Sequence, residues 1–270
     1  MAYLGGKAKG YQHIINILNN PCFDNYNYFE PFVGYAHILK RVVNKKSYIA
    51  NDKNILVYTL LKCIQRINCD FPHITEEEYY DLKNDNSKRN LLKKAFAAFT
   101  YSYNGKEFGG YTNILHGRNY PNERKKYYET LRENTTFIST KLYNKSYSDF
   151  KPKNKLIYCD PPYENTTSYK GSDNFNHDKF WKTMRKWSVD NYVFISEYNA
   201  PDDFILIESK NKLTTISGTR KKRIEKLFVH ESILDKPLYN TLFNSGNKSK
   251  KSKKSDKKRS DKKRSRKKSI

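Results

Sequence analysis

The sequence has 270 residues, of which 37% are hydrophobic, and its 52 Lys/Arg against 28 Asp/Glu give a formal net charge of +24. A chain of this length can bury a sizeable core without disulfides or metals, so we expect a single catalytic unit, an α/β domain with a smaller lobe. The four cysteines show no Cys-x-x-Cys spacing, and no signal peptide or long apolar stretch is present. The composition therefore argues against secreted and membrane-spanning classes and predicts a soluble, intracellular protein with reduced thiols.

The positive charge lies in both parts of the chain. Residues 248–270 hold fourteen Lys/Arg and two Asp, so this tail and the remaining body each carry +12. A basic body favours a nucleic-acid partner over a membrane, because Lys and Arg contacts to phosphate drive non-specific binding. We expect residues 245–270 to be disordered and to serve in DNA tethering or nuclear import. The abundance of Lys, Asn, Ile and Tyr fits an AT-rich genome, such as that of a large DNA virus or a protist.

The first predicted elements form a nucleotide-binding opening. Tyr3-Leu-Gly-Gly-Lys7 precedes a helix whose apolar positions run from Tyr11 to Leu18. A strand over 26–30 then breaks at Glu30-Pro-Phe-Val-Gly34 and leads into a helix-like pattern over 38–43. An ordinary strand-to-helix turn explains this loop about as well as a cofactor loop does.

A second short strand over 47–51 ends at Asp52, and an apolar helix follows over 55–61. An acid at this place in dinucleotide folds bonds the ribose hydroxyls of the ligand. The alternative is that Asp52 only caps the helix.

Residues 69–149 are polar, charged and rich in Tyr, with helical patterns over 76–83 and 91–99. This stretch is too long for a loop in a compact fold and predicts an inserted, mainly helical lobe. Its segment 99–111 combines aromatic residues, glycines and a lysine, which suits base stacking and phosphate contacts, although such aromatics more often pack in a core.

The apolar run Lys-Leu-Ile-Tyr-Cys over 155–159 stops at Asp160-Pro-Pro-Tyr163. Two prolines cannot continue a central strand, so Asp160 stands at the strand's C-terminal end, where open α/β sheets bind ligands. A strand entering a Pro-Pro turn beside an incidental acid is the alternative. The sharper interpretation is methyl transfer to an exocyclic amine: Asp160 and the Pro161 carbonyl accept both amino hydrogens, and Tyr163 stacks on a flipped base.

After this motif, residues 174–187 read as an amphipathic helix with Phe180, Trp181, Met184 and Trp187 on its apolar face. A buried strand over 191–197 ends in the polar residues Ser196 and Glu197. Residues 213–217 and 224–229 then predict a hairpin around a basic tip at 218–223.

These segments, in this order over residues 1–235, resemble the Dam-like (class alpha) DNA adenine-N6 methyltransferases. The resemblance implies a Rossmann-like α/β methyltransferase fold, a mostly parallel sheet with a C-terminal antiparallel hairpin. It places the catalytic domain at 1–68 and 150–240 and a target-recognition lobe at 69–149. The implied cofactor is S-adenosyl-L-methionine, and the implied partner is double-stranded DNA. We expect a monomer and no metal, and the sequence leaves open whether a restriction endonuclease is a companion.

The resemblance also assigns site residues. Asp160, Pro161 and Tyr163 are implied as catalytic, and Ser196 and Glu197 are implied to face the same pocket. The cofactor-binding set is Tyr3, Lys7, Glu30, Phe32, Gly34, Asp52 and Asp160. We add as DNA contacts Lys106, Tyr111, Arg118, Arg124, Lys125 and Lys126.

One departure stands in the glycine loop. The family's second glycine is replaced by Ala36, and alanine replaces glycine without strain only where φ is negative, so we expect a reshaped loop or weaker cofactor binding. Three functions therefore stay open: an active DNA adenine methyltransferase, a DNA-binding protein that has lost turnover, and amino methylation of cytosine N4, RNA or protein. A cytosine-C5 enzyme is disfavoured, because the one Pro-Cys pair, at 21–22, lies outside the predicted pocket-forming motifs.

Overall fold

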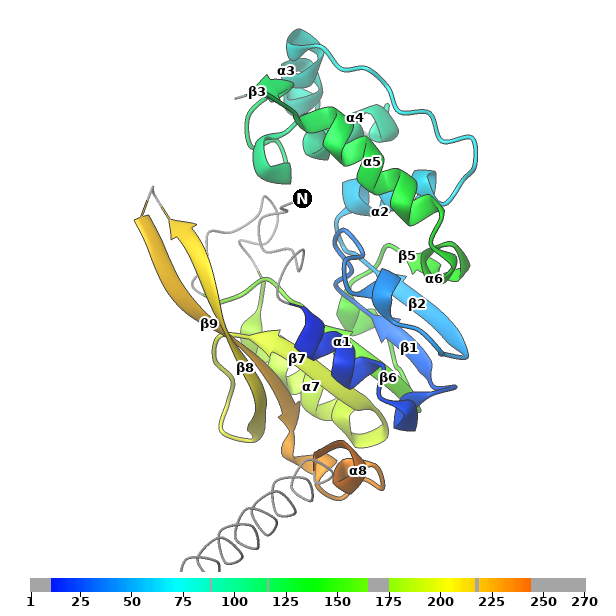
Figure 1. Cartoon of the computed structure of the whole chain (residues 1–270), viewed down its shortest axis with the longest axis vertical. Helices are drawn as coiled ribbons and strands as arrows, with labels where there is room; N and C mark the ends of the chain where they lie inside the picture. The colour runs from blue at the N-terminus through cyan, green and yellow to red at the C-terminus, as the bar shows by residue number, and fades with distance from the viewer. Residues whose placement is uncertain (1–10, 88, 116, 165–174, 217–218, 244–270) are drawn as a thin grey trace, which may run out of the picture.

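The structure is a computed structural model that describes residues 11–87, 89–115, 117–164, 175–216 and 219–243, and describes no side chains between 211 and 223 (Figure 1). Tyr3, Lys7 and the basic tail lie outside these residues. The predictions made for them are therefore carried by the sequence alone.

The fold is built on a seven-stranded mixed sheet. Its strands, in spatial order, are β5 (Lys141–Tyr143), β2 (Ser47–Asn51), β1 (Asn27–Glu30), β6 (Lys155–Cys159), β7 (Tyr192–Glu197), β9 (Thr219–His230) and β8 (Phe204–Ile216). The strands from β5 to β7 pair in parallel, and β9 runs antiparallel to both of its neighbours. This mostly parallel sheet with a C-terminal antiparallel pair confirms the predicted α/β methyltransferase fold.

The order of the strands reverses between β1 and β6. From β1 the chain moves outward through β2 to β5, and then returns to β6 on the other side of β1. Loops on the two sides of such a switch point diverge and leave a crevice at the carboxyl ends of the strands, where α/β proteins bind ligands. The loops after β1 and β6 are therefore the first place to look for a site.

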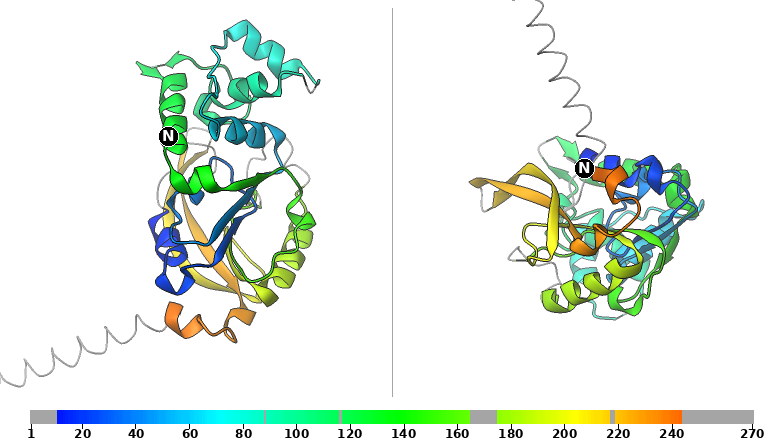
Figure 2. Two further views of the ribbon diagram at one scale, coloured as in Figure 1. Left: turned by 90° about the vertical axis from the view of Figure 1, so that its right-hand side faces the viewer. Right: turned by 90° about the horizontal axis from the view of Figure 1, so that it is seen from below.

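Each face of the sheet is covered by its own hydrophobic cluster. Alternate residues of β1 point to opposite faces, so Tyr28 packs in the cluster that includes α1 (Gln12–Leu18), whereas Phe29 packs in the cluster that includes α7 (His177–Asp190). Figure 2 shows these two helices on opposite sides of the sheet. As predicted, α7 buries Phe180, Trp181, Met184 and Trp187.

A helical lobe stands beyond the carboxyl ends of the strands (Figure 1). It follows α2 (Ile55–Ile64) and consists of α3 (Glu76–Asn84), α4 (Leu91–Phe99), the short ribbon β3–β4 (Ile114–Leu115 and Arg118–Asn119) and α5 (Tyr120–Arg132). The chain returns to the sheet through α6 (Thr135–Ser139). The predicted helices over 76–83 and 91–99 are thus present.

Two boundaries differ from the prediction. Strand β5 lies inside 69–149, the range predicted for the insert, yet it pairs with β2 in the main sheet. The lobe therefore ends before 141, and a strand of three residues was too short to be recognised from its pattern. The helix predicted over 38–43 is also wrong. Only one 3-10 turn forms, at Leu39–Arg41, and Val42 is already extended, as suits a β-branched residue.

The antiparallel strands β8 and β9 are longer than the predicted hairpin. They pair from Phe204 with His230 to Ile216 with Thr219, with one irregularity between Leu206 and Glu208. Their free end extends beyond the rest of the sheet on the side where the helical lobe lies (Figure 1). A short helix, α8 (Tyr239–Phe243), follows the sheet.

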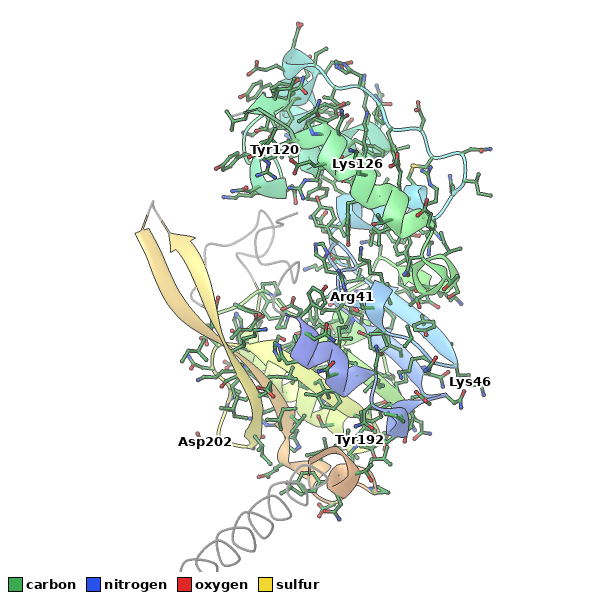
Figure 3. All side chains as sticks on the ribbon, in the orientation of Figure 1. Arg41, Lys46, Tyr120, Lys126, Tyr192 and Asp202 are labelled. Carbon is green, nitrogen blue, oxygen red and sulfur yellow. A yellow bond between two sulfur atoms is a disulfide. The ribbon has the colours of Figure 1, made fainter. Side chains whose placement is uncertain are left out.

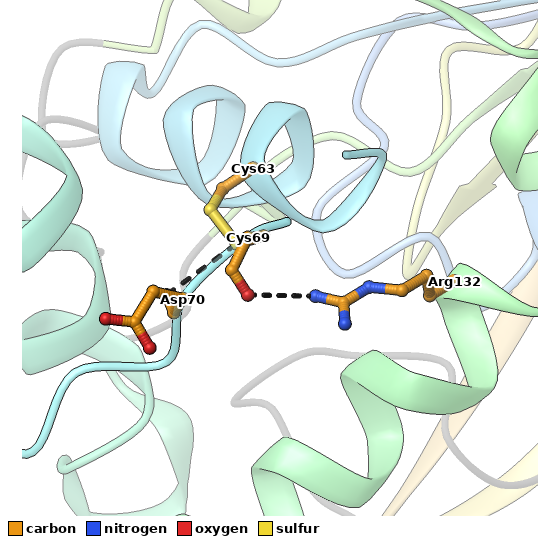
Figure 4. The surroundings of a disulfide bond; sticks show 4 residues. All are labelled: Cys63, Cys69, Asp70 and Arg132. Atoms are coloured by element: carbon orange, nitrogen blue, oxygen red, sulfur yellow. Dashed lines mark hydrogen bonds between the residues drawn. A yellow bond between two sulfur atoms is a disulfide. The ribbon is translucent and has the colours of Figure 1, made fainter. Parts of the chain in front are cut away.

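Cys63 and Cys69 form a disulfide (Figure 4), so the expectation that all thiols are reduced is wrong for this pair. Cys63 lies in the last turn of α2, and Cys69 lies just before the lobe. Arg132, at the end of α5, donates to the Cys69 carbonyl at 3.2 Å. The disulfide and this hydrogen bond tie together the entry and the exit of the lobe. The sequence signal, a spacing of six residues, was too weak to predict a bond.

Candidate active site

The loop after β1 keeps its glycine-type conformation although one glycine is missing. Gly34 has φ 48° and Ala36 has φ 57°, so both residues are left-handed. The Ala36 amide donates to the Val33 carbonyl at 2.8 Å, and the Ala36 side chain is fully buried. Alanine therefore does not take the negative φ that it prefers at this position, and weaker cofactor binding stays a prediction. The surrounding contacts compensate for the conformational strain of a left-handed alanine.

Asp52 holds this loop from the neighbouring strand. One carboxylate oxygen accepts the Gly34 amide at 3.0 Å, and the other accepts the Asn54 amide at 2.9 Å. The N-cap of α2 is Asn54, whose side chain accepts the Leu56 amide, so Asp52 is not the cap. Burial raises the pKa of Asp52 to about 6. Each carboxylate oxygen keeps a lone pair for a further donor, which suits a diol ligand at this position.

Asn51, the last residue of β2, joins three loops and was not singled out from the sequence. Its amide donates to the carbonyls of Pro31 and Lys145, at 3.0 and 3.1 Å, and its oxygen accepts the Lys145 amide at 2.9 Å. The loops after β1, β2 and β5 are thereby fixed to each other. In the sequence, the only indication of this role was a polar residue at the end of a mostly apolar strand.

The other two predicted cofactor residues of this loop face different ways. Glu30 is buried at the end of β1 and accepts the hydroxyl of Tyr28 at 2.8 Å. Phe32 packs its ring against those of Tyr147 and Phe180, on the α7 side of the sheet. Only Glu30 therefore lies on the same side of the sheet as Tyr28.

The turn after β6 presents the predicted catalytic residues. Asp160 is half-buried directly after the strand, and Pro161 is buried behind it. The Tyr163 hydroxyl donates to Glu225 on β9 at 2.7 Å, and its ring lies edge-on against Tyr198 with the centroids 4.8 Å apart. Burial, reinforced by Asp160 and Glu225, holds the pKa of Tyr163 well above its usual value, so the hydroxyl remains a donor.

Glu197, at the end of β7, supports the same turn. One of its oxygens accepts the Glu164 amide at 3.3 Å, and the other accepts the Tyr198 amide at 2.7 Å. The side chain is only 2% exposed, and burial together with the Asp160 charge raises its pKa to about 8. Ser196, by contrast, bonds the Tyr158 hydroxyl at 2.8 Å within the sheet. Glu197 is thus beside Asp160, as expected, while Ser196 has an internal partner.

The lobe residues predicted as DNA contacts divide into two groups. Lys126 is exposed on α5 (Figure 3), Arg118 is exposed and paired with Glu123, and Lys106 and Lys125 are half-buried. The other two are packing residues. Arg124 is 4% exposed, with its guanidinium against Gly105, and Tyr111 donates its hydroxyl to the Ile74 carbonyl. We therefore withdraw Arg124 and Tyr111 as DNA contacts.

Two lobe residues not predicted from the sequence reach the loops at the strand ends. Glu107 accepts the Asn54 side-chain amide at 2.6 Å, beside Asp52. Tyr127 on α5 donates its hydroxyl to the Tyr35 carbonyl at 2.7 Å. Sequence separations of 53 and 92 residues leave no local signal for such contacts. The lobe therefore supports the loops that follow β1 and β2.

Within the described part of the chain, no group of three or more His, Cys, Asp or Glu side chains is arranged to hold a metal ion. The helices described there are all too short or too polar to cross a membrane.

Several solved structures of methyltransferases are similar to this chain at low identity. The rRNA methyltransferase aviRa of Streptomyces viridochromogenes is 11% identical, with 87% of this chain and 90% of that chain covered and a TM-score of 0.39. An rRNA methylase of Streptococcus thermophilus is 9% identical (83% and 99% covered, TM-score 0.36). A precorrin-6y C5,15-methyltransferase of Geobacter metallireducens is 6% identical (84% and 91% covered, TM-score 0.35). No curated protein gives a significant sequence match.

The family comparison is specific. The model of the D12 class N6 adenine-specific DNA methyltransferases matches residues 3–236, which include the whole sheet, the lobe and both loops at the switch point. Methyl transfer by this class uses S-adenosyl-L-methionine as the donor. The chain belongs to the D12 class of N6 adenine-specific DNA methyltransferases.

Proposed function

We propose that this protein methylates N6 of an adenine flipped out of duplex DNA, with the reaction taking place between the Gly34 loop and the Asp160 turn. The observation that carries the proposal is the position of these two loops. They follow β1 and β6, the adjacent parallel strands at which the strand order reverses. Donor and acceptor of the methyl group would thus meet at one crevice.

The cofactor half of the site comes from the loops after β1 and β2. Gly34 offers a left-handed turn without a side chain, and Asp52 offers carboxylate lone pairs to ribose hydroxyls. Tyr3 and Lys7 join this set from the family resemblance. The bound cofactor supplies an electrophilic methyl group on a sulfonium.

The target half comes from the turn after β6. The N6 lone pair of adenine is delocalised into the ring, so the amine is a poor nucleophile. Asp160 and the Pro161 carbonyl would accept its two hydrogens and draw the lone pair out of the plane. As the N–C bond forms, the S–C bond of the donor would break and one N6 proton would be lost, and Asp160 is the acceptor that we propose for it. Tyr163 would stack on the flipped base.

The lobe and the basic surface would bind the duplex. The charge of the body supplies non-specific attraction to phosphate, and Lys106, Arg118, Lys125 and Lys126 are the lobe contacts that we retain. We propose that the lobe reads the target sequence. We further propose an intracellular protein that acts as a monomer.

The test is a labelling reaction. Purified protein, unmethylated duplex DNA and methyl-labelled S-adenosylmethionine should yield N6-methyladenine on nucleoside mass analysis. Asp160→Ala should lower the rate at least ~1000-fold, because a residue acting directly on the reacting atoms is removed, yet leave DNA affinity within about twofold. Asp202→Ala, an exposed aspartate labelled in Figure 3, is the control and should keep full activity.

Other outcomes would change the conclusion. N4-methylcytosine as the product would overturn the choice of base. If Asp160→Ala methylates at the wild-type rate, Asp160 takes no part in the chemistry. If the folded wild-type protein binds DNA but no cofactor, it is a DNA-binding protein without turnover.

A further inference from the structure

Tyr127 makes two contacts that flank the strained alanine of the β1 loop. Its hydroxyl donates to the Tyr35 carbonyl at 2.7 Å and lies 2.9 Å from Nδ1 of His37. The residue between them is Ala36, with φ 57°. One side chain of the lobe thus holds the backbone before Ala36 and the side chain after it.

The direction of the second contact follows from hydrogen-bond chemistry. A phenol has one hydrogen, and that of Tyr127 is given to the Tyr35 carbonyl, so Nδ1–H of His37 must be the donor to the Tyr127 oxygen. Burial, together with Lys40 and Arg41, lowers the pKa of His37 to about 3, so the ring stays neutral near neutral pH. The contact is therefore a fixed hydrogen bond between neutral groups.

The loop needs such support because of the residue at position 36. Glycine visits left-handed and right-handed conformations about equally, whereas alanine disfavours the left-handed one. Within the loop itself, Ala36 is held by its amide bond to Val33 and by the Lys40 amide bonded to its carbonyl. The contacts of Tyr127 come from outside the loop, since this residue of α5 lies 92 and 90 positions after its two partners.

We propose that Tyr127 is a positioning residue that keeps the Gly34–His37 loop in its cofactor-binding shape, replacing the conformational freedom that a second glycine would have provided at position 36. The proposal rests on the proposed cofactor site. It makes cofactor affinity depend on the lobe that contacts DNA, because α5 carries both Tyr127 and the exposed Lys126.

The test is a double-mutant cycle on cofactor binding. Tyr127→Phe keeps the ring and removes only the hydroxyl, and the lost hydrogen bonds should raise the Kd for S-adenosylmethionine about five- to tenfold. Introducing Ala36→Gly into that variant should restore the Kd to within about twofold of the wild type, since glycine holds the loop shape without help. Each Kd is measured calorimetrically on the full chain, after circular dichroism confirms folding.

The matched control is Tyr101→Phe. Tyr101 is also a buried tyrosine of the lobe whose hydroxyl donates to a backbone carbonyl, that of Pro72 at 3.2 Å, but its partner is outside the β1 loop. It should lower thermal stability about as much as Tyr127→Phe and leave the Kd unchanged. If Tyr127→Phe does not fold, His37→Leu is the second variant, because it removes the hydrogen bond between His37 and Tyr127. Ala36→Gly should restore the Kd of His37→Leu as well.

Two results would overturn the proposal. A further variant, at Gly34, distinguishes a failure of this proposal from a failure of the proposed cofactor site. Equal Kd values for Tyr127→Phe and Tyr101→Phe, or an equal effect of Tyr127→Phe with alanine and with glycine at position 36, would show that Tyr127 does not position the loop. Gly34→Val should abolish cofactor binding. If Gly34→Val has no effect while the wild type binds the cofactor, the loop is not the cofactor site at all.

Discussion

At the scale of single residues, the orientation of Tyr163 is set by two other side chains. Glu225 fixes its hydroxyl and Tyr198 supports its ring, so the face that we propose for base stacking is held in place by the folded protein. A preorganised stacking face lowers the entropy lost when the flipped base binds. Neither partner is near Tyr163 in the sequence.

We predict that Glu225→Ala slows methylation about tenfold by releasing Tyr163, with a larger effect on kcat than on DNA affinity. Tyr163→Phe should have a similar effect, and the double variant should be no worse than either single one, because both remove the same contact. Single-turnover methylation measures this. Glu231→Ala, an exposed glutamate after β9, is the control. Additive losses in the double variant would contradict the prediction.

Glu197 predicts a pH dependence of stability. Its pKa is about 8 in the folded protein and near 4.5 unfolded, so folding favours the protonated form. The stabilisation is complete below pH 4.5 and is lost as pH rises from there to 8, by on the order of a few kcal/mol. Glu197→Gln, which is always neutral, should unfold with a shallower pH dependence in urea titrations between pH 5 and 8. Glu208→Gln, on the exposed part of β8, should keep the wild-type slope; equal slopes for all three proteins would show that Glu197 is ionised.

At the scale of elements, the disulfide joins α2 to the start of the lobe. In the chain-entropy treatment, closing so short a loop stabilises the folded state by about 2 kcal/mol. We predict that dithiothreitol lowers the Tm of the oxidised protein and leaves that of Cys63→Ser/Cys69→Ser unchanged. Thiol titration of the denatured, unreduced protein should find two free cysteines, Cys22 and Cys159. Four reactive thiols would contradict the disulfide.

Helices and strands that are determined by neighbouring residues could be predicted from the sequence. The prolines after Asp160 end β6 where expected, and the apolar spacing of α7 gives its buried face. Arg124 was misjudged although its own spacing from Tyr127, Tyr128 and Leu131 places it on the buried face of α5. Its charge had been given more weight than its periodicity.

Features that depend on distant contacts could not be predicted. The positive φ of Ala36 is supported from α5, and Asn51 gains its importance from loops that only the folded sheet brings together. The three residues of β5 carry no strand pattern of their own and form a strand because β2 offers an edge. In each case tertiary structure decides between conformations that the local sequence leaves open.

At the scale of the whole molecule, charge is divided equally between the body and residues 248–270. We predict that a protein ending at residue 244 binds DNA more weakly and with a smaller slope of log K against log salt, because fewer counterions are released. Its methylation rate at saturating DNA should be unchanged, since every proposed catalytic residue lies in the body. Filter binding between 50 and 300 mM salt measures the slope; an unaltered slope would exclude the tail from the interface.

The hydrogen bond that Glu107 accepts from the loop after β2 and the one that Tyr127 donates to the loop after β1 also bear on how target specificity could be re-engineered. The chain enters the lobe at Cys69 and leaves it at α6, so the lobe could be exchanged for that of a relative through two connections. A relative with glycine at position 36 does not need the support of a tyrosine hydroxyl at position 127, so a lobe transplanted from it need not contain one. On this proposal such a chimera would bind its methyl donor about five- to tenfold more weakly, unless the β1 loop is transplanted with the lobe.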